Sequence, residues 1–142
     1  LKDGTKKMSK SELSDLSRIN LTDSKDEIIN KIKKAKTDPL PLPSVIKELE
    51  KRPEAKNLLG IYSSLTNSTL ENTIEIFGGK NFSEFKEKLS QVLIEKIDPI
   101  SIEIKKLVNE KEFLDKILLE GNNKAENIAS KKIKKMQEII GF

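Results

Sequence analysis

Apolar residues recur along most of this chain at intervals of three and four positions, which is the spacing of one face of an α-helix. The segment 1–22 is the exception, because it is rich in Lys, Ser, Asp and Gly and shows no sustained helical period. We expect a loop there, with short extended pieces around Ile19 and Leu21. No strand pattern follows it, so the sequence predicts an all-α helical bundle over residues 23–142.

The first helix is predicted from its cap. Ser24 and Glu27 have the spacing of a capping box, in which each side chain accepts a hydrogen bond from the backbone amide of the other residue. The helix should end near Asp38, because Pro39 and two further prolines at alternate positions force an extended segment. We interpret that segment as a linker or a surface strap. The apolar face of the helix would be Ile28, Ile29, Ile32 and Ala35.

Caps and breakers divide the next part of the chain into further helices. A short helix is expected at about 44–51 and a longer one at about 54–66. Ser68 and Glu71 have the spacing of a second capping box, and Gly78-Gly79 would end the helix that it starts. The apolar faces would be Ala55, Leu58, Leu59, Tyr62 and Leu65 in the longer helix, and Leu70, Ile74 and Phe77 in the one after it.

Two long helical stretches complete the chain. The first begins near Ser83 and must stop or kink at Pro99, although helical spacing continues after the proline. The second runs from about Glu112 to Ile140, and Gly141 is placed to close it. Both stretches add to the predicted bundle.

Lysines gather on one side of the last helix. At about 100° per residue, Lys124, Lys131 and Lys135 lie opposite an apolar face. They form either the solvated side of an amphipathic helix or a stripe that follows the phosphates of a nucleic acid, and the sequence leaves both interpretations open. The apolar face consists of Ala125, Ala129, Ile133, Met136 and Ile140.

Composition excludes several kinds of chemistry. The 142 residues include 27 Lys+Arg and 23 Asp+Glu, for a net charge of +4, but neither Cys nor His. Disulfides, thiolate nucleophiles, Cys/His zinc sites and histidine general bases are therefore excluded for this sequence, and we expect no metal-binding residue. No apolar run reaches the roughly 20 residues of a membrane span, and no signal-peptide pattern opens the chain, so we expect a cytoplasmic protein without a membrane partner.

Residues 7–11 carry the candidate chemistry. They read Lys7-Met8-Ser9-Lys10-Ser11, which is the KMSKS signature of class I aminoacyl-tRNA synthetases. When an amino acid attacks the α-phosphate of ATP, negative charge develops on the departing pyrophosphate, and two ammonium groups on a loop can stabilise it. Lys10 and Lys7 are the candidate catalytic residues, and all five residues are candidate ATP ligands, since hydroxyls and loop amides bind phosphate oxygens. The alternative is a solvated basic loop.

Beyond this motif, the chain resembles bacterial tryptophanyl-tRNA synthetases over essentially its whole length and in the same order. Glu12 is a minor departure, since the family often has Asp there. The resemblance implies a helical domain of the anticodon-binding type over 23–142, preceded at 1–22 by the KMSKS loop and the end of a Rossmann-type catalytic domain. The family's HIGH signature contains histidine, which this sequence lacks, so the rest of that domain and the tryptophan pocket should lie upstream. The segments that carry the resemblance are 3–11, 17–21, 33–38, 57–62, 77–86 and the tail, which runs from 117–121 through Ala125 and Ala129 to 140–142.

The resemblance implies part of a tryptophan–tRNA ligase. Such an enzyme uses ATP, accompanied by Mg²⁺, to form tryptophanyl-adenylate with release of pyrophosphate, and then transfers the amino acid to tRNA(Trp). A homodimer is implied for the full-length protein, whereas this fragment should not catalyse alone. Lys124, Lys131 and Lys135 are the candidate tRNA contacts, and no anticodon-reading residue is identified. Two alternatives remain: a non-catalytic helical RNA-binding or adaptor module, and another class I synthetase.

Overall fold

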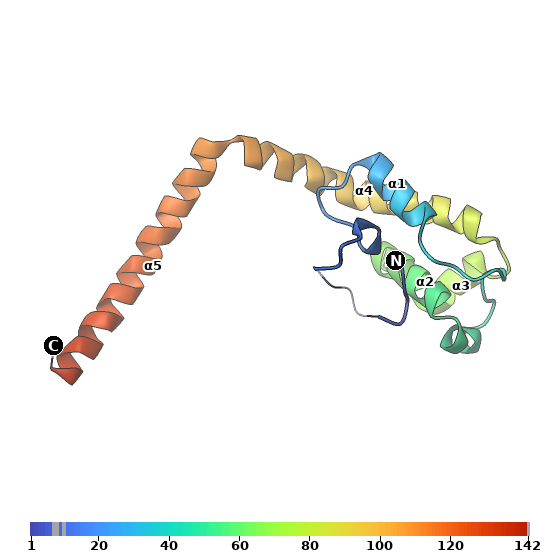
Figure 1. Cartoon of the computed structure of the whole chain (residues 1–142), viewed down its shortest axis with the longest axis horizontal. Coiled ribbons are helices and arrows are strands. Elements are labelled where there is room, and N and C mark those ends of the chain that lie inside the picture. Colours follow the sequence, from blue (N-terminus) through green and yellow to red (C-terminus); the bar gives the residue numbers. More distant parts are fainter. Residues whose placement is uncertain (7–8, 10, 142) are drawn as a thin grey trace. The chain divides into compact units, whose positions relative to one another are not determined.

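The structure, a computed structural model, describes residues 1–6, 9 and 11–141. The chain forms two compact units, Leu1–Ile102 and Glu103–Phe142 (Figure 1). The described residues contain helices and no strand, so the all-α prediction is confirmed. The α-helices are α1 (Lys25–Lys33), α2 (Pro53–Thr66), α3 (Leu70–Phe77), α4 (Phe82–Asn109) and α5 (Lys111–Ile140), and short 3₁₀ helices cover Asp15–Ser17 and Ile46–Lys51.

The predicted capping box starts α1. The Ser24 hydroxyl accepts from the Glu27 amide at 3.3 Å, and the Glu27 carboxylate accepts from the Ser24 amide at 2.7 Å. Ile28 and Ile32 are buried as expected, but Ile29 is 44% exposed, so the prediction was wrong for that residue. The two buried isoleucines are four positions apart and share one side of the helix, whereas position 29 is turned about 100° away from position 28.

The helix α1 ends at Lys33, well before the predicted end near Asp38. The Lys86 side chain of α4 donates to the main-chain carbonyls of Lys33 and Ala35, at 3.0 and 2.7 Å. These contacts satisfy carbonyl groups at and beyond the end of the helix. The Lys86 side chain therefore caps α1, while Pro39 has no amide hydrogen to donate to the Ala35 carbonyl and so cannot extend the helix.

The proline-rich segment is a strap fastened on both sides. Leu42 is buried, its amide donates to the Lys80 carbonyl, and its carbonyl accepts from the Gly79 amide, both at 2.9 Å. The Arg52 guanidinium contacts the Asp38 carboxylate at 3.0 and 2.5 Å and also donates to two carbonyls of the strap. The segment is therefore packed against other parts of the first unit, as expected of a surface strap and not of a free linker.

The helices α2 and α3 follow their predicted spans closely, with one correction at the junction. α2 ends where Asn67 adopts a left-handed backbone conformation, with φ at 53°. The Ser68 amide still bonds back to the Ser63 carbonyl at 3.0 Å, so Ser68 belongs to the end of α2. The cap of α3 is Thr69, whose hydroxyl accepts from the Asn72 amide at 3.2 Å. The capping box predicted at Ser68 is therefore wrong by one position.

Pro99 does not end α4, which continues to Asn109. The sequence predicted that the helix would either stop or kink at this proline, and the predicted stop is wrong. An interior proline removes one backbone hydrogen bond of the helix. Ile97 and Ser101, on either side of it, are buried with exposures of 8% and 2%, so packing on both sides stabilises the helix across the proline.

Aromatic rings lie at the centre of the first unit. The centroids are 4.9 to 5.9 Å apart among the rings of Tyr62, Phe77 and Phe85. Two residues of the N-terminal segment, Leu1 and Ile19, are partly buried and pack against the same core. The segment 1–22 is thus held by the helices of the first unit, and the predicted domain division after residue 22 stays a prediction.

The second unit consists of the end of α4 and the whole of α5. No residue described within α5 is buried, and its predicted apolar face is exposed, with Ile133 at 55% and Met136 at 62%. Gly141, with φ at 83°, closes the helix as predicted. Nowhere in the described part of the chain does a helix combine the length and the apolar character that a bilayer crossing requires.

Candidate functional site

Of the five residues of the KMSKS motif, the structure describes two. Lys7, Met8 and Lys10, and with them both predicted catalytic side chains, lie outside the described residues. Ser9 and Ser11 are exposed and their hydroxyls are 2.9 Å apart, while the Ser11 amide donates to the Ser9 hydroxyl at 3.3 Å. The role of all five residues as ATP ligands stays a prediction.

Residues 1–6, which we call the upstream stem, are fastened to the helices of the first unit. Leu1 packs against the core, and its carbonyl accepts from the Lys36 amide just beyond α1 at 3.0 Å. Gly4 lies directly against the start of α2, since a Cβ atom added there would be 2.5 Å from the Pro53 carbonyl oxygen. Only glycine permits so close an approach of two backbones.

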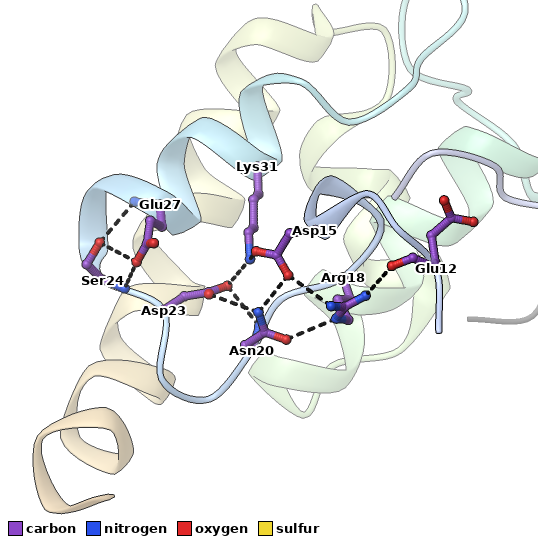
Figure 2. Close-up of polar contacts among 8 residues, drawn as sticks. All are labelled: Glu12, Asp15, Arg18, Asn20, Asp23, Ser24, Glu27 and Lys31. Carbon is purple, nitrogen blue, oxygen red and sulfur yellow. Dashed lines mark hydrogen bonds and ion pairs between the residues drawn. The ribbon is translucent and has the colours of Figure 1, made fainter. Parts of the chain in front are cut away.

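Residues 12–23, which we call the downstream stem, are joined to α1 by a buried lysine (Figure 2). The Lys31 side chain is 5% exposed, and its Nζ lies 2.7 Å from the Asp23 carboxylate and 2.5 Å from the Asp15 carboxylate. The Asp23 side chain is itself only 6% exposed, whereas that of Asp15 is 53% exposed. Lys31 therefore connects two carboxylates of the downstream stem to a helix of the core.

Asn20 and Arg18 extend this connection toward the motif, as Figure 2 shows. The Asn20 side-chain amide donates to Asp15 at 3.0 Å and to Asp23 at 3.2 Å, and its carbonyl oxygen accepts from Arg18 Nε at 3.2 Å. Arg18 also contacts Asp15 at 3.2 Å and donates to the Glu12 main-chain carbonyl at 3.2 Å. Glu12 directly follows the motif. We call the connected side chains the stem network: Asp15, Arg18, Asn20, Asp23 and Lys31.

The stem network balances its charges, with two cations and two carboxylates. Burial alone would lower the pKa of Lys31, but its hydrogen bonds to Asp15 and Asp23 and the negative charges of these carboxylates together outweigh burial, so the pKa is raised above its usual value. The hydrogen bond from Lys31 is also the main cause of the lowered pKa of Asp15. Lys31 and Asp15 are therefore charged throughout the neutral pH range.

The described residues provide no preformed metal site. Among them, no group of three or more His, Cys, Asp or Glu side chains is placed to hold a metal ion. The two carboxylates of the stem network contact Lys31 and Arg18 instead. A cation needs several oxygen ligands free of such partners, and these two carboxylates are engaged.

The predicted tRNA contacts lie on one helix. Lys124, Lys131 and Lys135 all belong to α5, so the helical spacing assumed for them holds. Lys131 and Lys135 are about one turn apart, and Lys124 lies about two turns before Lys131, which brings all three to one side. All three side chains are exposed, as both a phosphate-binding stripe and a solvated face require. Their role stays a prediction.

Sequence reasoning missed the stem network. One signal was readable, because Lys31 lies between Ile28 and Ile32 on the side of α1 that packs into the core. A lysine buried there needs a carboxylate partner, since an unpaired buried charge is strongly destabilising. The identity of that partner was not readable, because Asp15 and Asp23 come from an irregular loop.

Comparison with known proteins covers the whole chain. The family described as "tRNA synthetases class I (W and Y)" matches residues 1–98. The tryptophan–tRNA ligase of Agrobacterium fabrum is 49% identical over 142 residues, which are all of this chain and 40% of that protein. The tryptophan–tRNA ligases of Rickettsia felis and Caulobacter vibrioides are 49% and 42% identical over the same 142 residues, which are 42% and 41% of those proteins. The chain therefore spans about two fifths of the length of these relatives.

Proposed function

This chain belongs to the W and Y family of class I tRNA synthetases, and on that premise we propose that it is the C-terminal part of a tryptophan–tRNA ligase. The observation that carries the proposal is the 49% identity with the Agrobacterium fabrum ligase along the entire chain. The choice of tryptophan over tyrosine rests on the names of the relatives. The KMSKS motif supports a role in catalysis. The stems on both sides of it are held by hydrogen bonds, from the Lys36 amide to the Leu1 carbonyl and from Arg18 to the Glu12 carbonyl.

In this proposal, the motif acts on the pyrophosphate that leaves ATP. A carboxylate oxygen of tryptophan bonds to the α-phosphorus, the bond from that phosphorus to the pyrophosphate oxygen breaks, and negative charge develops on the leaving group. The ammonium groups of Lys7 and Lys10 stabilise this charge, while the Ser9 and Ser11 hydroxyls and the Met8 amide donate to phosphate oxygens. Mg²⁺ enters with the phosphates of ATP, and no residue of this chain is proposed as its ligand.

The second step transfers tryptophan from the adenylate to the 3′ end of tRNA(Trp). We propose that the helical part of this chain binds the tRNA, with Lys124, Lys131 and Lys135 as phosphate contacts. The pocket for L-tryptophan belongs to a part of the protein outside this chain. By likeness to the family, the full-length protein is proposed to be a homodimer that works in the cytoplasm.

The full-length protein provides the test. It should catalyse exchange of pyrophosphate into ATP that depends on added tryptophan. Lys10→Ala should reduce this exchange by at least about 10²-fold, the loss expected when a preorganised charge contact to a transition state is removed. Lys6→Ala is the matched control, because Lys6 lies outside the motif and its ammonium group is 3.6 Å from Asp3.

Each outcome discriminates between interpretations. Exchange driven by tyrosine or another amino acid would assign the chain to a different synthetase. Absence of exchange with any amino acid would favour a non-catalytic RNA-binding or adaptor module. Near-normal exchange in Lys10→Ala would refute the role of this lysine while leaving the assignment of the enzyme intact.

A further inference from the structure

We propose that Lys31 and Arg18 are positioning residues for the KMSKS loop, and that the stem network transmits the position of α1 to the motif. This inference rests on the proposed function, since positioning the KMSKS loop matters only if the loop acts in catalysis. It concerns the downstream stem, whose side chains the structure describes completely.

An unbroken path of polar contacts runs from α1 to the residue that follows the motif. Lys31 projects from α1 onto Asp15 and Asp23, at 2.5 and 2.7 Å. Asn20 joins these carboxylates to Arg18, and Arg18 donates to the Glu12 carbonyl at 3.2 Å. Every link is a hydrogen bond or an ion pair, and the last acceptor belongs to the residue that follows the motif (Figure 2).

Asp23, one of the two carboxylates that contact Lys31, lies at the start of α1. Asp23 immediately precedes Ser24, whose capping box with Glu27 orders the first turn of the helix. The Asp23 carboxylate accepts from the Asn20 main-chain amide at 2.8 Å as well as from Lys31. Asp23 is therefore held from the helix and from the loop at once, and its carboxylate has little freedom to move.

The energetics favour a positioning role over a purely stabilising one. A buried ion pair is weak evidence for stability, because the cost of removing both charges from water can exceed their attraction. Apolar side chains of similar volume are often as stable at such a place. A charged network differs from an apolar contact in that each partner accepts only a narrow range of distances and directions. The network therefore specifies one arrangement of the downstream stem.

The upstream stem is joined to the downstream stem, because the Leu1 nitrogen donates to the Ser17 carbonyl at 3.0 Å, and it also has contacts of its own with the first unit. The Leu1 carbonyl is bonded to the Lys36 amide, and Gly4 lies against the Pro53 carbonyl. The upstream stem is thus held at Lys36 and at the start of α2, and the downstream stem at Lys31 of α1, while Ser9 and Ser11 between the stems are exposed. A displacement of either stem by about 1 Å would move the motif relative to ATP, and misplacements of this size can cost about 10²-fold in rate.

Three variants of the full-length protein test the inference. Lys31→Met removes the central cation and keeps a side chain of similar length. Arg18→Gln removes the link to Glu12 and leaves no buried charge without a partner, because Asp15 is 53% exposed and keeps its contact with Lys31. Lys25→Met is the control, because Lys25 also projects from α1 into an ion pair, with Asp98 of α4 at 3.0 Å, and this pair includes neither stem.

The first readout is the rate of tryptophan-dependent exchange per competent site, with sites counted by titration of the adenylate formed. We expect a loss of about 10-fold or more in Lys31→Met and Arg18→Gln, with the KM for tryptophan unchanged, and a normal rate in Lys25→Met. Counting competent sites separates displacement of the motif from loss of folded protein. If Lys31→Met does not fold, Arg18→Gln decides.

The second readout is hydrogen exchange of the amides of Asn20 and Asp23, which are hydrogen-bonded within the downstream stem at 2.8 and 3.1 Å. It should be accelerated in Lys31→Met and Arg18→Gln and unchanged in Lys25→Met. If both variants fold, exchange pyrophosphate per site at the rate of Lys25→Met and protect these amides normally, the inference is wrong. If the unaltered protein shows no amino-acid-dependent exchange, the proposed function fails, and hydrogen exchange still decides whether the network holds the loop.

Discussion

A single methyl group at Gly4 should disturb the motif without touching it. A Cβ atom there would lie 2.5 Å from the Pro53 carbonyl oxygen, 2.6 Å from the Pro53 carbonyl carbon and 2.9 Å from the Glu54 amide nitrogen. Ordinary van der Waals contact begins at 3.4 Å. All three atoms are backbone at the start of α2, which cannot turn aside as a side chain can, so the upstream stem has to move by about 1 Å.

We expect Gly4→Ala to reduce tryptophan-dependent exchange by about 10²-fold per competent site, which is the loss that a misplacement of 1 Å can cause. The free energy of unfolding should fall by roughly 1–3 kcal/mol, as is typical of overpacking. The assay uses the full-length protein and combines the exchange rate, the titration of competent sites and a urea unfolding curve.

Gly60→Ala is the matched control for this prediction. Gly60 lies inside α2, in the same unit, and an added Cβ would meet no atom within 4 Å. Alanine should therefore stabilise the helix by about 0.5–1 kcal/mol and leave the exchange rate unchanged. A Gly4→Ala protein that folds and exchanges pyrophosphate at the normal rate would refute the reasoning, because the stem could then move without consequence for the motif.

Two further predictions concern α5 and the strap. Replacing Lys131 and Lys135 together by alanine should weaken tRNA binding and reduce its salt dependence by at most about two phosphate contacts, whereas an unchanged salt slope would mark a solvated face. Asp38→Asn should destabilise the protein at neutral pH. Burial raises the pKa of Asp38, but the hydrogen bonds from Arg52 and the Leu40 amide, together with the Arg52 charge, outweigh burial and lower the pKa below the usual 3.8. A carboxyl group whose pKa is lowered by folding stabilises the fold at pH values above its usual pKa. This stabilisation is lost as the pH falls through the pKa of the folded state. The free energies of unfolding of the unaltered protein and of Asp38→Asn, measured in urea, should therefore differ at neutral pH and become equal in acid. A difference that persists in acid would contradict a stabilising role for the ionised Asp38 carboxylate.

Local signals in the sequence predicted local structure well. The capping box at Ser24 formed as expected, because both partners lie in the first turn of one helix. The end of α1 was not predictable in the same way, since the capping Lys86 comes from a helix far along the chain. The cap of α3 moved to Thr69 because Asn67 ends α2 in a left-handed conformation, which the spacing of Ser and Glu does not reveal.

In the candidate site, too, residues that are contiguous in the sequence could be predicted, whereas residues that the fold brings together could not. Lys7 and Lys10 were found from a contiguous motif, and no geometry was needed to propose their chemistry. The partners of Lys31 depend instead on the path of an irregular loop, which brings Asp15 and Asp23 to one ammonium group. Sequence periodicity encodes which face of a helix is buried, but it carries no comparable rule for loops.

The requirements of the proposed chemistry explain why buried charges occur at the base of the loop. In the proposed mechanism Lys7 and Lys10 act as cations, so the proposal requires that their ammonium groups have a defined position. A lysine side chain is flexible and fixes no position by itself. Because the Coulomb energy falls with distance, the backbone that carries these lysines has to be placed accurately. Among the described residues, the charged side chains that are buried are Asp23 and Lys31, and they lie where the downstream stem of the motif joins the helical core.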